Sequence, residues 1–403
     1  MLPQRFSIDD PDPFLRWIGS SDPLQLDEIE MIQVWGLAGL ATLSRHGHPS
    51  PIMVDTEGSK PATRFAKALG LESIITGQPP TGPAEEGRTV KLTRIQRFPG
   101  LSPYEVAGQI SRLLIPDDTD DTRHTIYYVL AELLRNVVQH SRDPLGGIVA
   151  AQLMTAGRGG YDRDMVQVAV SDAGIGIPES LRHYHPQYSD PEAALVRALD
   201  PHVSGTFEPG LSGTDENAGL GLFFIAEMAK QAAGRLLIAS KGARLLLDGA
   251  RPGHARIDTK PVGFPGTLVA FELPDRGVSD NHVLLERINE LARERTPKRV
   301  TQRWLRYEPP PEGVQRFLVA IAAEDTTAAR QFAEANLESR LMKRESVALD
   351  FATLSICTQS FLHALLFETL RLAWAKRLPL YMLNVKPAVR SSLDLLESYA
   401  LGG

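Results

Sequence analysis

The chain has 403 residues, of which 43% are hydrophobic and 23% charged, enough apolar material for two or three cores of about 150 residues each. The formal net charge of −6 excludes a general attraction to nucleic acid or to an anionic membrane surface. The single cysteine, Cys357, excludes an internal disulfide and a cysteine-based zinc site, which fits a reducing compartment. No stretch approaches the roughly 18 uninterrupted apolar residues of a spanning helix, so we expect a cytoplasmic protein without membrane contact.

The first piece of the chain, residues 1–99, reads as a small α/β domain. Apolar periodicity predicts a helix at 31–43, and a short apolar run predicts a strand at 51–55. A helix at 61–71 follows, with a proline in its first turn. The Pro- and Gly-rich stretch at 76–87 predicts a loop before the second piece.

The second piece, residues 100–275, begins with a long predicted helix at 119–140, where apolar residues recur with helical spacing. Glu132 and Asn136 are four residues apart and so share one face of this helix, away from its apolar stripe. A carboxylate and an amide oxygen there suit a magnesium ion and a reacting water. Taken alone, the two residues are better explained as a solvated helix face.

A predicted strand at 166–171 runs directly into Asp172-Ala173-Gly174-Ile175-Gly176. A carboxylate at a strand end can accept a hydrogen bond from an adenine amino group. The glycines let the backbone turn and approach the base closely. On its own, such a stretch is usually a plain glycine-rich turn.

Gly219 and Gly221 open the next predicted helix, which runs to about residue 233 with Gly234 as its stop. Glycines before a helix leave free N–H groups at its positive end, a common arrangement for holding phosphates. A hairpin is predicted within 235–247, turned at Lys241-Gly242. A final strand at 268–273 follows Gly266-Thr267.

After this piece we expect a charged helical linker at 276–312, with a helix at 281–295, and then an α/β domain at 313–403. Alternating strands and helices argue for parallel strands in that last domain. The predicted strands are 317–321, 347–351 and 380–383, and the predicted helices are 327–341, 360–376 and 388–401.

Arginines and aromatic side chains are interleaved in the linker. Arg303, Trp304, Arg306 and Tyr307 follow one another closely after the charged helix. Such a stretch can contact nucleic acid. A solvated linker that packs its aromatic residues is the better explanation, given the negative net charge.

The four motifs of the second piece, in this order and on these element types, resemble the GHKL superfamily. That superfamily includes histidine kinases, anti-sigma serine kinases, gyrase-type topoisomerases, heat-shock chaperones and mismatch-repair ATPases. The resemblance implies a central Bergerat-fold α/β sandwich that binds ATP with Mg²⁺. The matched residues are Glu132 and Asn136 for the N box, Asp172 to Gly176 for the G1 box, Gly219 to Gly221 for the G2 box, and Gly266-Thr267 for the last box.

The resemblance also implies a role for each polar residue. Asn136 would ligate Mg²⁺, and Glu132 would act as the general base or position the attacking water. Asp172 would read the adenine. Thr267 would support Asp172 or the adenine.

The matched glycines would make close approaches to the nucleotide. Gly174 and Gly176 would shape the base pocket, while Gly219 and Gly221 would hold phosphates. Residues 179–218, which include several glycines, would form a lid that orders over the nucleotide.

Two departures from the family pattern bear on turnover more than on binding. Many family members carry a basic residue three positions after the N-box asparagine, where this chain has Gln139. The segment 266–274 contains no lysine, so a catalytic lysine after the last box is absent.

The last domain is similar to a STAS-like module, in which a strand ends in Asp-Phe and a serine or threonine opens the next helix. The first piece, 1–99, can be interpreted as a degenerate relative. In anti-sigma antagonists with this fold, a serine near that helix start is phosphorylated by a GHKL kinase. Thr358 or Ser360 could be such an acceptor, but helix capping is the better explanation.

Two functions from different classes therefore stay open. The first is a slow ATPase or a serine/threonine protein kinase in cytoplasmic signalling or stress response, with a protein partner bound through the STAS-like domains. The second is a nucleotide-sensing module without turnover. A histidine kinase is disfavoured because no helical hairpin precedes the N box, and a DNA-remodelling ATPase because no transducer domain is visible. A homodimer is a further expectation that the sequence leaves open.

Overall fold

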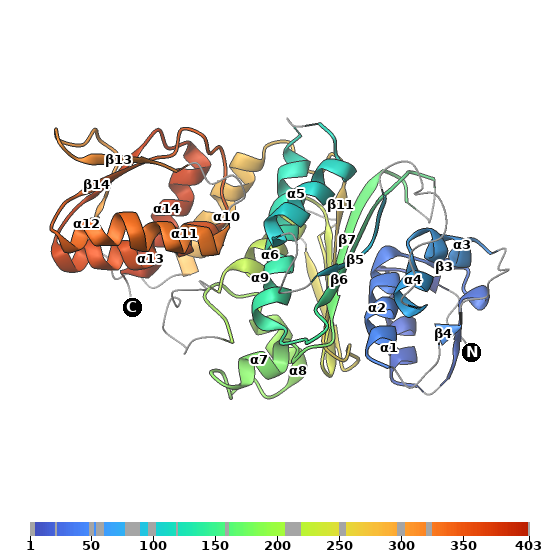
Figure 1. Ribbon diagram of the computed structural model, residues 1–403. Helices are drawn as coiled ribbons and strands as arrows, with labels where there is room; N and C mark the ends of the chain where they lie inside the picture. The colour runs from blue at the N-terminus through green and yellow to red at the C-terminus, as the bar shows by residue number, and fades with distance from the viewer. Residues whose placement is uncertain are drawn as a thin grey trace. The chain divides into compact units, whose positions relative to one another are not determined.

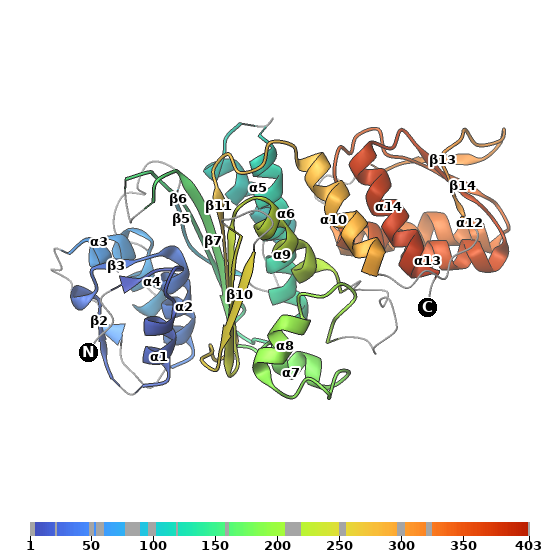
Figure 2. The same cartoon turned by 180° about the vertical axis from the view of Figure 1, so that it is seen from behind.

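The computed structural model describes two compact units, Met1–Arg197 with Ile225–Ser279 and Ala198–Phe224 with Asp280–Gly403 (Figures 1 and 2). Among the described residues, no helix is both long and apolar enough to cross a membrane. The described residues are 5–20, 22–47, 52–53, 60–76, 89–95, 102–117, 120–157, 161–205, 219–249, 255–295, 303–319 and 325–401.

The first unit is built on one antiparallel sheet of seven strands in the order β10-β9-β8-β11-β7-β6-β5. The predicted strands and the hairpin of the second piece are confirmed, with Gly242 at the hairpin turn in the left-handed region (φ +89°). The strands are β5 (Thr89–Ile95), β6 (Gly147–Met154), β7 (Met165–Asp172), β8 (Arg235–Ser240), β9 (Ala243–Asp248), β10 (Arg256–Lys260) and β11 (Thr267–Pro274).

Helices α5 (Pro103–Leu114) and α6 (Asp121–His140) cover one face of this sheet. Helix α5 begins with a capping box between Ser102 and Glu105. Helix α6 begins after Asp120, whose side chain accepts a hydrogen bond from the Thr122 amide. The long predicted helix is therefore confirmed, although residue 119, its predicted first residue, lies outside the described residues.

The N-terminal residues cover the other face of the same sheet (Figures 1 and 2). Their helices are α1 (Asp12–Ile18), α2 (Val34–Arg45), α3 (Pro61–Ala68) and α4 (Leu71–Thr76), with a 3-10 turn at Leu26–Glu28. Two short parallel pairs join them: β1 (Arg5–Phe6) with β3 (Met31–Ile32), and β2 (Leu24–Gln25) with β4 (Ile52–Met53). Most of the loop predicted at 76–87 lies outside the described residues.

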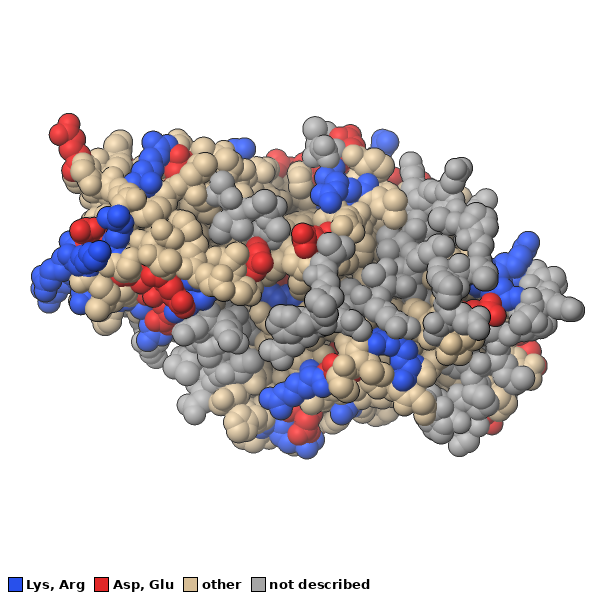
Figure 3. Space-filling model, viewed as in Figure 1, with Lys and Arg blue, Asp and Glu red and all other residues tan. Residues whose placement is uncertain are grey.

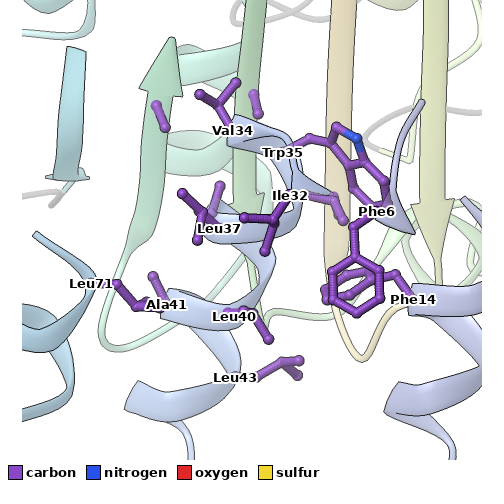
Figure 4. Packing of buried hydrophobic residues seen from close by; sticks show 14 of the residues in the cluster. Phe6, Phe14, Ile32, Val34, Trp35, Leu37, Leu40, Ala41, Leu43 and Leu71 are labelled. Carbon is purple, nitrogen blue, oxygen red and sulfur yellow. The ribbon is translucent and has the colours of Figure 1, made fainter. Parts of the chain in front are cut away.

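Helix α2 lies directly against β6 and β7, and its buried side chains share one hydrophobic cluster with the sheet. The rings of Phe6 and Phe14 lie near Trp35 of α2 (Figure 4), and the ring centroids of Phe14 and Trp35 are 5.2 Å apart. The sheet contributes small and branched side chains to the same cluster, among them Ile148 and Leu268. The N-terminal layer therefore has its core in common with the sheet, and a domain boundary at residue 99 remains a prediction.

The second unit contains a parallel four-stranded sheet in the order β12-β15-β14-β13, as the alternation predicted. Helix α10 (Asn281–Arg295) packs against α14 (Pro387–Ala400), so the charged helix is part of this unit. Strand β13 ends at Leu318, and a π-helical turn (Ala333–Glu338) interrupts the helix predicted at 327–341. The remaining elements are β12 (Leu305–Arg306), β13 (Gln315–Leu318), α11 (Thr326–Phe332), α12 (Ser339–Met342), β14 (Val347–Asp350), α13 (Gln359–Lys376) and β15 (Leu380–Leu383).

Candidate functional site

Asp172, the predicted adenine-reading residue, ends the fully buried strand β7 and is itself only 5% exposed. It lies opposite Thr267 in the β7–β11 ladder. Burial and, to a smaller extent, the negative charge of Asp143 raise the pKa of the Asp172 carboxyl to about 7. Hydrogen bonds from the backbone N–H groups of Gly174 and Thr267 act in the opposite direction. The first unit therefore holds a buried carboxyl group that titrates near neutrality, the kind of group that clusters at functional sites.

The turn after Asp172 requires its glycines. A Cβ atom on Gly174 would lie 1.9 Å from the carbonyl oxygen of Ser141. Gly176 has φ +76°, and a Cβ there would lie 2.8 Å from the Ser240 hydroxyl. A Cβ on Gly266 would lie 2.3 Å from the Asp172 carbonyl. These contacts bring two of the predicted motifs, the turn after β7 and the start of β11, together with Ser141 at the end of α6.

Hydrogen bonds from outside the turn hold three of its backbone amides. The amide of Ala173 donates to Oδ2 of Asp143 (2.8 Å), and the amide of Ile175 donates to the carbonyl of Ser141 (2.8 Å). The amide of Ile177 donates to the Ser240 hydroxyl (2.9 Å), which in turn donates to the Gly266 carbonyl (2.7 Å). Contacts within the protein therefore hold the turn in this conformation.

Asp143 and Ser240 are residues that the sequence motifs did not single out. Asp143 follows α6 in a Ser-Arg-Asp-Pro segment, and this turn signal was the available indication that it organises backbone amides. Its side chain is fully buried and also contacts His46 at the end of α2, with 3.1 Å between Nε2 and Oδ2. A second contact with the N-terminal layer involves Thr42, whose hydroxyl lies 2.6 Å from the hydroxyl of Ser171, the residue before Asp172.

Glu132 is buried on α6 and lies in an ion pair with Arg135, with 2.7 Å between Oε2 and Nη2. The solvated-face interpretation is therefore wrong for Glu132. Burial lowers the pKa of Arg135, but the charge of Glu132, the hydrogen bond to it and two nearby tyrosines together hold that pKa above its ordinary value. Arg135 also donates to Oε1 of Gln139 (2.8 Å), so the residue that replaces the expected basic side chain is bound to an arginine one turn away.

Asn136 is half-buried, and no described residue forms a hydrogen bond with its side-chain amide. Its oxygen is therefore available to a metal ion. Among the described residues, no group of three or more His, Cys, Asp and Glu side chains could hold a metal without a ligand's help. Mg²⁺ fits this arrangement because it is commonly bound by one or two protein groups together with substrate phosphates and water.

Residues 121–276 match the sequence family described as histidine kinase-, DNA gyrase B- and HSP90-like ATPases. This stretch is a GHKL-type ATPase domain. ATP binding follows from that match for a protein of this type. No curated protein and no solved structure matches the chain.

Gly219 and Gly221, which the sequence predicts to hold phosphates, fall in the second compact unit. Gly219 has φ +63°, and its carbonyl accepts a hydrogen bond from the Val203 amide (3.3 Å). Helix α9 (Gly221–Gln231) begins two residues later. Part of the predicted lid is helical, as α7 (Ile177–Arg182) and α8 (Pro191–Arg197). Residues 206–218, with two of its predicted glycines, lie outside the described residues.

The end of α9 corrects one prediction. The left-handed residue is Ala233 (φ +53°), and Gly234 follows it with its amide donating to the Ala229 carbonyl (2.8 Å). Gly234 is glycine for a different reason, because a Cβ there would lie 2.4 Å from the Glu272 carbonyl. Close packing against β11, and not backbone conformation, explains this residue.

Proposed function

We propose that this protein is an ATP- and Mg²⁺-binding regulatory protein with a Bergerat fold, acting as a slow ATPase or a serine/threonine protein kinase. Asp172 carries the proposal, since it is a buried carboxyl group beside a pre-positioned glycine turn, within the stretch that matches the ATPase family. In this proposal Asp172 accepts a hydrogen bond from the adenine amino group. Gly174 and Gly176 make room for the base.

The phosphate end of the nucleotide would be held by Gly219 and Gly221 together with Mg²⁺. Asn136 would ligate the metal, since its amide is free of hydrogen bonds to described residues. Mg²⁺ would neutralise charge on the phosphates. Glu132 would act on the attacking group as general base or by positioning it, and Thr267 would support Asp172 through its backbone amide.

A second candidate is a non-catalytic nucleotide sensor that regulates a protein partner. The ion pair between Glu132 and Arg135 favours it, because this carboxylate is already bound to a buried guanidinium and is not free to orient a water molecule. In that case ATP would change contacts made by the flanking elements without being consumed.

The proposed context is cytoplasmic signalling, with STAS-like flanking domains that bind a protein partner and with a homodimer as one further form. Thr358 is 1% exposed and caps α13 by accepting from the Phe361 amide, which argues against it as a phosphoacceptor. Ser360 is half-buried and remains the better candidate. On the face drawn in Figure 3, described Lys and Arg side chains are interspersed with Asp and Glu, which gives little support to nucleic-acid binding.

The deciding experiment incubates the purified protein with γ-labelled ATP and Mg²⁺ and follows free phosphate and protein-bound label together. Free phosphate that disappears in Glu132→Gln would support the ATPase, and label that is lost in Ser360→Ala would support the kinase. ATP binding without either product would leave the sensor. Failure of the wild type to bind ATP in calorimetry, or unchanged binding in Asp172→Asn, would refute the assigned site.

A further inference from the structure

The second unit carries an open surface cleft of about 1110 Å³ that the nucleotide site does not explain. It lies at the β12 edge of the parallel sheet, beside the end of α13. Its walls are rich in aromatic and charged side chains, namely Trp304, Arg306, Glu308, Trp374, Arg377 and Tyr381.

The fold holds the walls of this cleft in place. Buried Glu397 accepts hydrogen bonds from the amides of Trp304 (2.5 Å) and Leu305 (2.9 Å), which fixes the start of β12. Arg306 lies opposite Tyr381 in the β12–β15 pair. Arg377 ends α13 in the left-handed conformation (φ +59°), a conformation that non-glycine residues seldom adopt. The backbone that carries these side chains is therefore fixed, so binding does not have to order it.

The interleaved arginines and aromatic residues of the linker divide between two environments. Arg303 and Tyr307 both bind Oδ1 of Asp394, each at 3.0 Å, and so stabilise the unit itself. Trp304 and Arg306 line the cleft instead. Packing of the linker explains the side chains of the first pair but not the side chains of Trp304 and Arg306.

Within the part of the chain that the structure describes, the two guanidinium groups of the cleft are unpaired. Neither Arg306 nor Arg377 forms an ion pair or side-chain hydrogen bond with any described residue, and Glu308 compensates for only one of the two charges. Trp374 is 56% exposed, a large apolar area to leave in water. The cleft is therefore a locally positive, aromatic surface on a chain of net charge −6.

We propose that this cleft docks an acidic segment of a protein partner, with carboxylates on Arg306 and Arg377 and an apolar or proline side chain against Trp374. Trp, Tyr and Arg are the residue types that dominate binding energy at protein interfaces. Small-molecule pockets are instead enclosed and mostly apolar, unlike this open and largely polar cleft. Two guanidinium groups without a partner among the described residues favour an acidic segment over a neutral one by charge complementarity.

The test uses the full chain and an array of short blocked peptides in which two glutamates flank leucine or proline at varied spacing. A matched array replaces each glutamate by glutamine. The strongest acidic peptide is then titrated at low salt while tryptophan fluorescence is recorded, since Trp374 would lose water contact. We expect the glutamine peptide, and the Arg306→Gln/Arg377→Gln double variant, each to weaken binding roughly tenfold or more.

Two further variants separate docking from folding. Arg371→Gln removes a positive charge from the same helix, where the guanidinium lies over Phe367 and outside the cleft, and should bind as the wild type does. Trp374→Ala should weaken binding, and Trp374→Phe should restore most of it. Equal binding of the glutamate and glutamine peptides, or unchanged binding by the double variant, overturns the proposal. A third result also overturns it: no preference for the glutamate peptides, together with binding of a thymidine oligonucleotide that the double variant loses. That result would assign the cleft to nucleic acid.

Discussion

Replacing Asp143 by alanine should weaken ATP binding, although Asp143 itself is not expected to touch the nucleotide. The carboxylate accepts hydrogen bonds from the amides of Ala173 and Leu145 and contacts His46. Leu145 and His46 are near solvent and can bind water instead, whereas the Ala173 amide belongs to the turn beside Asp172. One part-buried amide that loses a charged acceptor costs about 1.5 kcal/mol, which corresponds to roughly a tenfold loss of affinity if ATP must restore the turn.

The same variant should change the pH dependence of binding. The charge of Asp143 helps to raise the pKa of Asp172, so its removal should lower that pKa. Isothermal calorimetry with ATP over a range of pH measures the affinity and the pH at which the affinity changes half-way, here called the midpoint. Asp162→Ala is the matched control, because that side chain is 86% exposed and pairs only with its neighbour Arg163 among the described residues. Affinity and midpoint both equal to those of the wild type would refute the role assigned to Asp143.

Three further outcomes are expected. The pKa of Asp172 is raised from 3.8 to about 7, so folding favours its protonated form. The free energy of unfolding should therefore fall as the pH rises from 3.8 to about 7. ATP, which donates to the carboxylate, should bind more tightly above about pH 7 than below it, and a flat calorimetric profile would contradict this. Gly174→Ala should abolish ATP binding because its Cβ would meet the Ser141 carbonyl, whereas Gly19→Ala, with its nearest neighbour at 3.6 Å, should bind normally. Thr358→Ala should cost about 1 kcal/mol of unfolding free energy through the lost cap of α13, which urea denaturation of the second unit can measure.

Local patterns predicted the elements of the site well. Four predicted features depend on neighbours a few residues away, and the structure has each of them: the helix α6, the strand before Asp172, the hairpin at Gly242 and the parallel domain at the C-terminal end. The roles of the matched residues in binding ATP remain predictions.

Long-range contacts were beyond the reach of these patterns. The burial of Glu132 and the bond from Asp143 to Ala173 depend on which elements meet in space, and no spacing encodes that. One indication was present in α2, where every residue from Val34 to Leu43 is buried. A helix that is apolar on all sides is usually buried between two layers. This property of α2 could have predicted that the N-terminal helices pack against the sheet.

The shared core of the N-terminal layer has a practical consequence for anyone who wishes to study the ATPase domain by itself. A fragment cut at residue 99 would lose α2, and the sheet would then present the side chains of Ile148 and Leu268 to water along with the small residues between them. Such a fragment is expected to precipitate or to associate through this bare face. A soluble ATP-binding fragment would have to begin upstream of α1, at the very start of the chain. A protease that cuts between the N-terminal helices would leave the helical layer and the sheet associated until the protein is denatured.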